Sequence, residues 1–263
     1  MRVVVVGASG LFGAAVVGDL SARGVDVVAA QRSTGVDAYQ GSGLSEAFAG
    51  ADVVVDCLNL MTTRARRAID FFGTSATNIG RAAASAGASV VCLSIVNAND
   101  PAVNAKFGYY QGKSAQEKAY REVLAPASPT PAPLTIVAST QWYDLAAQMM
   151  SQMRLGPLAV VPHMRCRPAA VGDVAAAFAD VVTTPVTGAA TEARRVEIAG
   201  PDELDLLDVA RAIAQRDGSP RKVFGVNVGG AAIREGGLIP AHPDVVTPTT
   251  LTQWLAADSD GRG

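Results

Sequence analysis

The sequence predicts an α/β protein with a doubly wound parallel sheet and a smaller C-terminal lobe. Three observations carry this prediction. Short valine-rich runs alternate with alanine-rich segments of helical length, the runs are apolar at nearly every position, and the first run leads into a glycine-rich turn. Strands that are apolar throughout are buried on both faces, as in a parallel sheet. Their regular alternation with helices indicates right-handed crossovers.

The apolar runs predict strands in the first half of the chain at residues 2–6, 25–30, 52–57, 89–94 and 134–138. The segments between them predict helices at residues 11–23, 44–50, 69–86 and 114–124. The proline-rich stretch at residues 125–133 is expected to be an exposed loop, because proline fits neither a helix interior nor a central strand.

From residue 145 onward the alternation weakens. Two helices are expected there, one led by Asp173 and one that begins with the acidic turn PDEL and ends at Gly218. We therefore divide the chain into a core at residues 1–145 and a lobe at residues 146–263, which interleaves with the core in a single compact unit.

Composition excludes several classes of protein. The chain has 263 residues, of which 49% are hydrophobic and 17% charged, and its formal net charge is −2. Such a charge gives no broad basic field for nucleic acid or an anionic membrane, and no apolar run approaches the roughly 20 residues that span a bilayer. The three cysteines are widely spaced and match no metal or redox motif, which fits a reducing compartment. We predict a cytoplasmic monomer or homodimer without a metal site.

The glycine-rich turn follows the first predicted strand, in the segment MRVVVVGASGLFGAAVV. Gly7, Gly10 and Gly13 recur at steps of three where the strand ends and a helix begins. Glycine brings the backbone close to a pyrophosphate, and a helix N-terminus favours phosphate. The alternative is a tight turn in which glycine serves packing alone, but the strand–turn–helix context favours a dinucleotide. The expected contacts are Gly7, Ser9, Gly10, Leu11, Phe12 and Gly13.

The GxxGxxG spacing and several later motifs resemble the atypical and extended short-chain dehydrogenase/reductase superfamily, close to its NmrA-like, NAD(P)H-binding branch. The segment GADVVVDCLN resembles that superfamily's fourth strand, VVCLSIVN its fifth, YYQGKSAQEKAYRE its active-site helix and LTIVASTQWYD its sixth strand. The match covers roughly the first two-thirds of the chain. It implies a Rossmann-type core with a C-terminal substrate-binding lobe, and cofactor contacts at Leu58, Asn59 and Thr140.

The end of the second predicted strand bears on which dinucleotide binds. In a Rossmann site an acidic residue there accepts hydrogen bonds from the adenosine ribose of NAD, whereas an arginine pairs with the 2′-phosphate of NADP. Here the strand ends without a carboxylate, and Arg32 supplies a fork of donors beside Ser33 and Thr34. We predict that NADP(H) is preferred over NAD(H); the alternative is an ordinary surface arginine. By the resemblance, Asp37 matches an aspartate that contacts adenine.

Tyr109 and Lys113 are four residues apart, so on a helix they share one face, and they match the superfamily's YxxxK pair. The resemblance implies that the lysine holds the nicotinamide ribose and lowers the pKa of the tyrosine, which exchanges the proton that accompanies hydride transfer. Tyr110 lies three residues from Lys113, so either tyrosine can be the acid. Ser94 matches the third catalytic member, which polarises a substrate carbonyl, but Ile95 stands where relatives often carry a second hydroxyl, so the alternative is that Ser94 lines the cofactor and does not reach the substrate.

These features lead to three hypotheses of function. The first is an NADP(H)-dependent oxidoreductase that transfers hydride to a small apolar carbonyl, enone or quinone held under the C-terminal lobe. The second is an NmrA-like regulator that senses the dinucleotide without turnover, which the missing second hydroxyl favours. The third, ranked last, is a sugar-nucleotide epimerase or dehydratase, because such relatives usually carry a longer C-terminal domain. A small-molecule substrate is expected in the first case, with no direct contact to nucleic acid or membrane.

Overall fold

The computed structural model describes residues 1–125, 132–184, 193–228 and 230–260. The chain divides into two compact units. The first unit comprises Met1–Ala138 and Ala175–Val196, and the second comprises Ser139–Val174 and Glu197–Gly263. Most of the proline-rich stretch at 125–133 lies outside the described residues.

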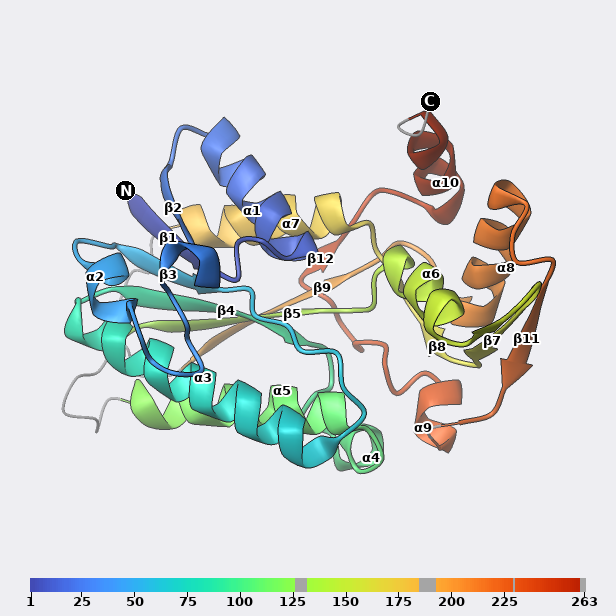
Figure 1. Ribbon diagram of the computed structural model, residues 1–263, viewed down its shortest axis with the longest axis horizontal. Helices are drawn as coiled ribbons and strands as arrows, with labels where there is room; N and C mark the ends of the chain where they lie inside the picture. The colour runs from blue at the N-terminus through green and yellow to red at the C-terminus, as the bar shows by residue number, and fades with distance from the viewer. Residues whose placement is uncertain (126–131, 185–192, 229, 261–263) are drawn as a thin grey trace. The chain divides into compact units, whose positions relative to one another are not determined.

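The central sheet has seven strands in the order β12–β9–β5–β4–β3–β1–β2 (Figure 1). The ladders that join β1 to β2 and to β3, β3 to β4, and β9 to β12 are parallel. This architecture confirms the predicted doubly wound parallel sheet. The strands are β1 (Arg2–Val6), β2 (Asp26–Ala30), β3 (Val53–Asp56), β4 (Ser89–Ile95), β5 (Leu134–Ser139), β9 (Arg194–Ala199) and β12 (Val245–Val246).

Each of the five predicted strands is present, with ends within one residue of the expected positions. β1, β3, β4 and β5 are buried at nearly every position, as their continuous apolar runs predict. β2 is apolar as well, but most of it is partly exposed because it lies at the edge of the sheet. An apolar run therefore predicted a strand here without predicting its burial.

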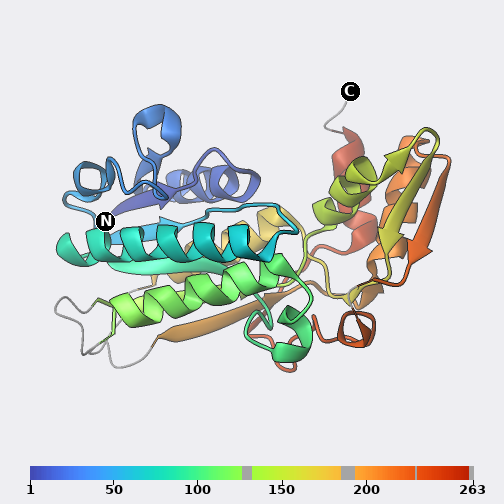
Figure 2. The ribbon, with the colours of Figure 1, turned by 60° about the horizontal axis from the view of Figure 1, so that its bottom comes forward.

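Helices cover both faces of the first unit's sheet (Figures 1 and 2). α3 and α5 lie side by side on one face, and α1 and α7 lie on the other, where Phe12 packs edge-on against Phe178 with ring centroids 5.3 Å apart. The helices are α1 (Leu11–Ala22), α2 (Leu44–Phe48), α3 (Ala65–Ser85), α4 (Pro101–Asn104), α5 (Gly108–Val123) and α7 (Val171–Thr183).

Three of these helices begin earlier than the sequence predicts, and one of them is α7, which begins at Val171 and not at Asp173. α3 begins at Ala65 and not at residue 69, and α5 begins at Gly108 and not at residue 114. The early turns of α5 contain glycine, which disfavours an isolated helix. Packing explains them, because a Cβ at Gly112 would lie 2.8 Å from the Cβ of Ala68 on α3. Glycine thus permits the close approach of the two helices.

The second unit contains a three-stranded sheet in the order β11–β7–β6 and a two-stranded pair, β10–β8. The expected PDEL helix begins later than predicted, because the Asp205 carboxylate caps α8 by accepting a hydrogen bond from Leu207 N at 3.0 Å; it ends before Gly218, as predicted. The elements are α6 (Tyr143–Gln152), β6 (Arg154–Leu155), β7 (Leu158–Pro162), β8 (Arg165–Cys166), β10 (Leu204–Asp205), α8 (Leu206–Asp217), β11 (Lys222–Val226), α9 (Ala231–Arg234) and α10 (Leu251–Asp260).

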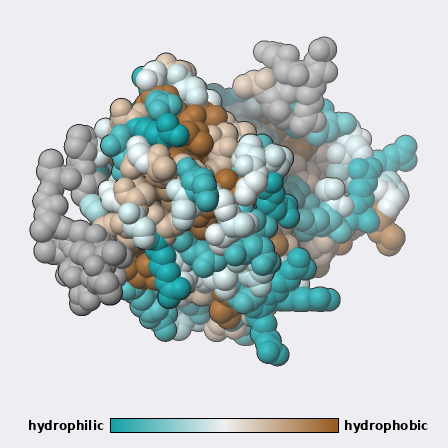
Figure 3. All heavy atoms as spheres, turned by 60° about the vertical axis from the view of Figure 1, so that its left-hand side comes forward, coloured by the Kyte–Doolittle hydropathy of each residue, from teal (hydrophilic) through white to brown (hydrophobic). Residues whose placement is uncertain are grey.

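The described residues were compared with what a membrane span or a metal site requires. Among the described residues, no helix is long and apolar enough to cross a membrane. The same residues contain no group of three or more histidine, cysteine or acidic side chains that could hold a metal ion. On the face shown in Figure 3, hydrophobic residues lie in small groups among hydrophilic ones.

Candidate functional site

The turn between β1 and α1 requires glycine at two positions. Gly7 has φ +80°, in the left-handed region, and a Cβ there would lie 3.1 Å from the carbonyl of Cys57. A Cβ at Gly13 would lie 2.9 Å from the Gly7 carbonyl carbon and closer still to its oxygen. Glycine at these positions therefore lets the turn pack against both the end of β3 and the first turns of α1.

The N-terminus of α1 presents backbone N–H groups without competition from side chains. Gly10 is its N-cap, no side chain of the described residues caps it, and its first turn holds no acidic residue. A helix N-terminus of this kind carries a partial positive charge and unsatisfied donors. Together with the close turn, it provides the environment that stabilises a bound phosphate.

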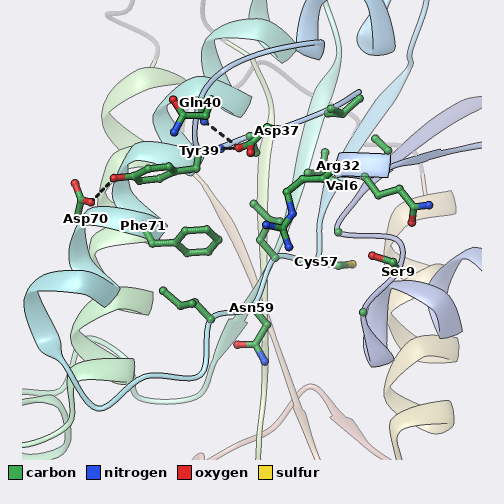
Figure 4. A pocket seen from close by; sticks show the side chains of 18 of the residues that line it. Val6, Ser9, Arg32, Asp37, Tyr39, Gln40, Cys57, Asn59, Asp70 and Phe71 are labelled. Carbon is green, nitrogen blue, oxygen red and sulfur yellow. Dashed lines mark hydrogen bonds between the residues drawn. The ribbon is translucent and has the colours of Figure 1, made fainter. Parts of the chain in front are cut away.

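A cavity of about 600 Å³ lies beside this turn (Figure 4). It is lined by the glycine turn, the end of β2, the loop that follows, the end of β3 and the early part of α3. In the sheet, β1 stands between β2 and β3, so the order of strands reverses here. The carboxyl ends of strands at such a switch point are where open α/β sheets bind ligands.

Several predicted cofactor contacts line this cavity: Gly7, Ser9, Gly10, Arg32, Asp37, Leu58 and Asn59. Others lie elsewhere. Phe12 is buried against Phe178, Gly13 fits beneath Gly7, and Leu11 is 60% exposed at the start of α1. Thr140 belongs to the second unit, where its Oγ1 donates to Arg167 O at 2.5 Å.

Arg32 begins a short 3₁₀ helix, η1 (Arg32–Thr34), and its side chain points into the cavity (Figure 4). The neighbouring hydroxyls hold the turn: Ser33 Oγ accepts from Gln31 Nε2 at 2.8 Å, and Thr34 Oγ1 donates to Gln31 O at 2.9 Å. Ser33 and Thr34, expected beside a phosphate, are thus used within the turn. Among the described residues, none forms a hydrogen bond or ion pair with the Arg32 guanidinium.

The loop after η1 is tied to α3 at the cavity wall. Asp37 Oδ1 accepts hydrogen bonds from Tyr39 N at 2.9 Å and Gln40 N at 3.0 Å. The Tyr39 ring stacks on Phe71, with centroids 5.9 Å apart, and its hydroxyl donates to Asp70 Oδ2 at 2.6 Å. That hydrogen bond and the negative charge of Asp70 raise the pKa of Tyr39. Tyr39 and Phe71 thus form one wall of the cavity, the Tyr39–Phe71 wall. This wall is fixed to Asp37 on one side and to α3 on the other (Figure 4).

Sequence reasoning missed the residues that α3 contributes to the cavity. Arg67, Asp70 and Phe71 line it, at a spacing that places them on one face of the helix. Because the helix is expected to start at residue 69, Arg67 lies outside the expected helix, and the shared face of the three residues is not apparent. The spacing would have revealed the face had the helix been expected from Ala65.

Lys113 lies inside the protein and does not line the cavity. Its side chain is 2% exposed, and Nζ donates to Leu93 O at 3.0 Å, Gln116 Oε1 at 3.0 Å and Leu58 O at 3.3 Å. The ammonium also lies 4.5 Å from the centroid of the Phe72 ring. All three of its N–H donors therefore have acceptors within the protein.

Ser94 is also buried, and its Oγ donates to Glu117 Oε1 at 2.5 Å. Glu117 is fully buried and also bonds Asn99 Nδ2 at 2.7 Å, Arg121 at 3.1 Å and Arg195 at 3.2 Å. Burial alone would raise the pKa of this carboxyl, but the Arg195 charge, Ser94, Arg121 and Asn99 outweigh it, so the pKa lies below its ordinary value. The proton of Ser94 is thus committed to an ionised carboxylate.

The two candidate tyrosines differ in exposure. Tyr109 is half-buried and packs edge-on against Phe72, with centroids 5.9 Å apart. Tyr110 is 6% exposed and packs against Phe107 at 6.1 Å. Neither tyrosine lines the cavity, and Tyr109 is the more exposed of the two.

No protein-family model matches the chain, and no curated protein sequence matches it. Solved structures do. The chain is similar to MoeE5 in complex with UDP-glucose and NAD, with a TM-score of 0.74 and 15% identity, over 100% of each chain. It is similar to a short-chain dehydrogenase/reductase superfamily protein from Agrobacterium tumefaciens with bound NAD, with a TM-score of 0.68 and 15% identity, over 100% of this chain and 97% of that one.

A third similar structure is the dTDP-4-dehydrorhamnose reductase from Bacillus anthracis in complex with NADP, with a TM-score of 0.63 and 14% identity, over 96% of this chain and 92% of that one. Similarity at this level of identity establishes the fold. The fold implied by the resemblance to short-chain dehydrogenases/reductases is therefore confirmed, whereas the NmrA-like branch stays a prediction.

Proposed function

We propose that the cavity binds NADP(H) and that the protein is an NADP(H)-dependent oxidoreductase of the short-chain dehydrogenase/reductase type. The observation that carries this proposal is the Arg32 guanidinium, which points into the cavity without a partner among the described residues, while no carboxylate ends β2. An arginine at this position suits the 2′-phosphate of NADP. The NAD and NADP in the similar structures support a nicotinamide dinucleotide.

The residues of the cavity fit such a cofactor. A pyrophosphate would lie at the N-terminus of α1, where Gly7 and Gly10 leave the backbone accessible. The adenine end would lie between Arg32 and the Tyr39–Phe71 wall, beside Asp37. When bound, the nicotinamide supplies or accepts a hydride. The chain's part is to orient the cofactor and to supply the accompanying proton, a role we assign to Tyr109.

The substrate class is less restricted than the sequence suggested. The third hypothesis ranked last because sugar-nucleotide enzymes were expected to carry a longer C-terminal domain. The match to MoeE5, bound to UDP-glucose, covers 100% of both chains, so length no longer counts against a sugar nucleotide. We therefore add a nucleotide-linked sugar that carries a carbonyl to the candidate substrates of this reaction, along with a small apolar carbonyl, enone or quinone.

A sensor without turnover is the second candidate, and one observation favours it. The polar atoms of Ser94 and Lys113, which catalysis would direct at substrate and cofactor, are engaged by Glu117 and by backbone carbonyls. A regulator needs only the cavity. A partner would then recognise the NADP(H)-bound protein, and no hydride would be transferred.

The test is NADPH oxidation with quinones, enones and nucleotide-linked 4-keto sugars, followed by absorbance. A reductase oxidises NADPH with one of these classes, and Tyr109→Phe lowers its kcat about 100-fold or more with unchanged NADPH affinity. Tyr110→Phe is the matched control on the same helix turn and should keep most activity. Tight NADPH binding without oxidation of NADPH by any of these substrate classes would contradict the reductase and favour the sensor.

A further inference from the structure

A closed ring of hydrogen bonds holds the backbone of Leu58 at the cavity wall. Asp56 Oδ1 accepts from Leu58 N at 2.9 Å, and Leu58 O accepts from Lys113 Nζ at 3.3 Å. Lys113 Nζ donates to Gln116 Oε1 at 3.0 Å, and Gln116 Nε2 donates to Asp56 Oδ2 at 2.7 Å, which closes the ring. We refer to these four residues as the Asp56 ring.

The three polar side chains of the Asp56 ring are deeply buried. Asp56 is 0% exposed, Gln116 1% and Lys113 2%, so a carboxylate and an ammonium are joined through one amide, away from water. Buried charges are stable only when paired and hydrogen-bonded, and the loss of one partner leaves the other uncompensated. Tyr120 OH also donates to Asp56 Oδ2, at 2.8 Å, but it bonds neither Leu58 nor Lys113 and stands outside the ring.

The peptide that the ring holds is the one on which the glycine turn rests. A Cβ at Gly7 would lie 3.1 Å from the Cys57 carbonyl carbon and 3.2 Å from Leu58 N, the same N–H that Asp56 binds. Cys57, Leu58 and Asn59 also line the cavity. A shift of the Cys57–Leu58 peptide would therefore disturb the turn and the cavity wall together.

We propose that Asp56 is a positioning residue of the dinucleotide site, acting through the Leu58 peptide, and that Lys113 serves in the same ring. The inference rests on the proposed binding of NADP(H). The ring supports the glycine turn, which would hold the pyrophosphate common to both dinucleotides. Its loss should therefore weaken NADPH and NADH alike, unlike the loss of Arg32, which should affect NADPH alone.

The experiment measures NADPH and NADH affinity by nicotinamide fluorescence, well below the melting temperature of each variant. Asp56→Asn should raise both dissociation constants about tenfold. Tyr120→Phe is the matched control: it removes a buried hydrogen bond to the same carboxylate outside the ring, and both dissociation constants should stay within about twofold of wild type. Combining Asp56→Asn with Lys113→Met should cost no more affinity than either change alone, because the two act as one unit.

If Asp56→Asn does not fold, Gln116→Met opens the ring without removing a charge, and the same loss for both dinucleotides is expected. Wild-type affinity in the ring variants, a loss confined to NADPH, or an equal loss in Tyr120→Phe would overturn the positioning role. Wild-type protein that binds neither dinucleotide would instead refute the proposed function, and this inference with it.

Discussion

The cavity beside the glycine turn and the polar side chains along α5 differ in whether their charged groups have partners within the protein. In the cavity, Arg32 is exposed, and no residue of the described chain bonds its guanidinium. Along α5, Lys113 and Glu117 are buried, and each has at least three hydrogen-bonding or ionic partners. Both regions belong to the first unit.

This difference separates binding from chemistry. Arg32 is exposed, so water can satisfy its donors, and its place in the cavity lining leaves those donors available to a ligand. Groups that satisfy one another, as Ser94 and Glu117 do, are first of all structural. The cavity lining thus favours the proposed dinucleotide site, whereas no residue of α5 lines the cavity, so the catalytic role proposed for Tyr109 rests on its spacing from Lys113 and on its exposure.

Gly13→Ala should give the largest effect. The new Cβ would enter the Gly7 carbonyl, so the turn must move; we expect a loss of about 3 kcal/mol in the free energy of unfolding and of dinucleotide binding. Gly18→Ala on the same helix is the control, because nothing lies within 4 Å of its Cβ, and it should stabilise by roughly 0.5–1 kcal/mol. Denaturant unfolding and a titration measure both. Wild-type affinity in Gly13→Ala would refute the assigned turn.

Glu117→Gln should come next and should affect stability alone. It leaves Arg195 without its buried carboxylate, at a cost of about 3 kcal/mol in the free energy of unfolding, while NADPH affinity stays unchanged because Glu117 does not line the cavity.

The pH dependence follows from the lowered pKa of Glu117. A carboxyl whose folded pKa lies below its unfolded pKa stabilises above the unfolded value, and this stabilisation is lost as the pH falls through the folded pKa. Wild-type protein should therefore lose more stability on acidification than Glu117→Gln. Parallel acid denaturation curves would contradict the lowered pKa.

Arg67→Ala should give the smallest effect, a loss of NADPH affinity of about threefold, because the arginine is exposed and screened by water. Arg66→Ala, at the preceding position of α3 and outside the cavity lining, is the control and should bind as wild type. The difference should shrink at high ionic strength. Equal effects of the two variants would mean that the net charge of α3, and not Arg67 itself, acts on the ligand.

Much of the first unit could be predicted because its signals are local. Continuous apolar runs gave the strands, and the strand–turn–helix context gave the glycine turn. The Tyr39–Phe71 wall could not be predicted, since it joins a loop to a helix far along the chain. Asp56 was hidden as well, because a single acidic residue at the end of an apolar run says nothing of the helix whose Gln116 and Tyr120 donate hydrogen bonds to it.

The second unit was harder to predict for the same physical reason. Its small sheet pairs Lys222 with Leu158, and β6 and β10 have only two residues each, too few to show a period. The helix α8 was expected from the acidic PDEL turn and the terminal Gly218, but its start was misplaced, since PDEL precedes a cap at Asp205.

The most direct test is a side-by-side titration of the protein with NADPH and NADH, followed by nicotinamide fluorescence and repeated on Arg32→Ala. We predict that NADPH binds more tightly than NADH, that Arg32→Ala weakens NADPH about tenfold or more, and that NADH affinity does not change. Equal affinity for the two dinucleotides, or an Arg32→Ala variant that binds NADPH as wild type does, would contradict the central claim.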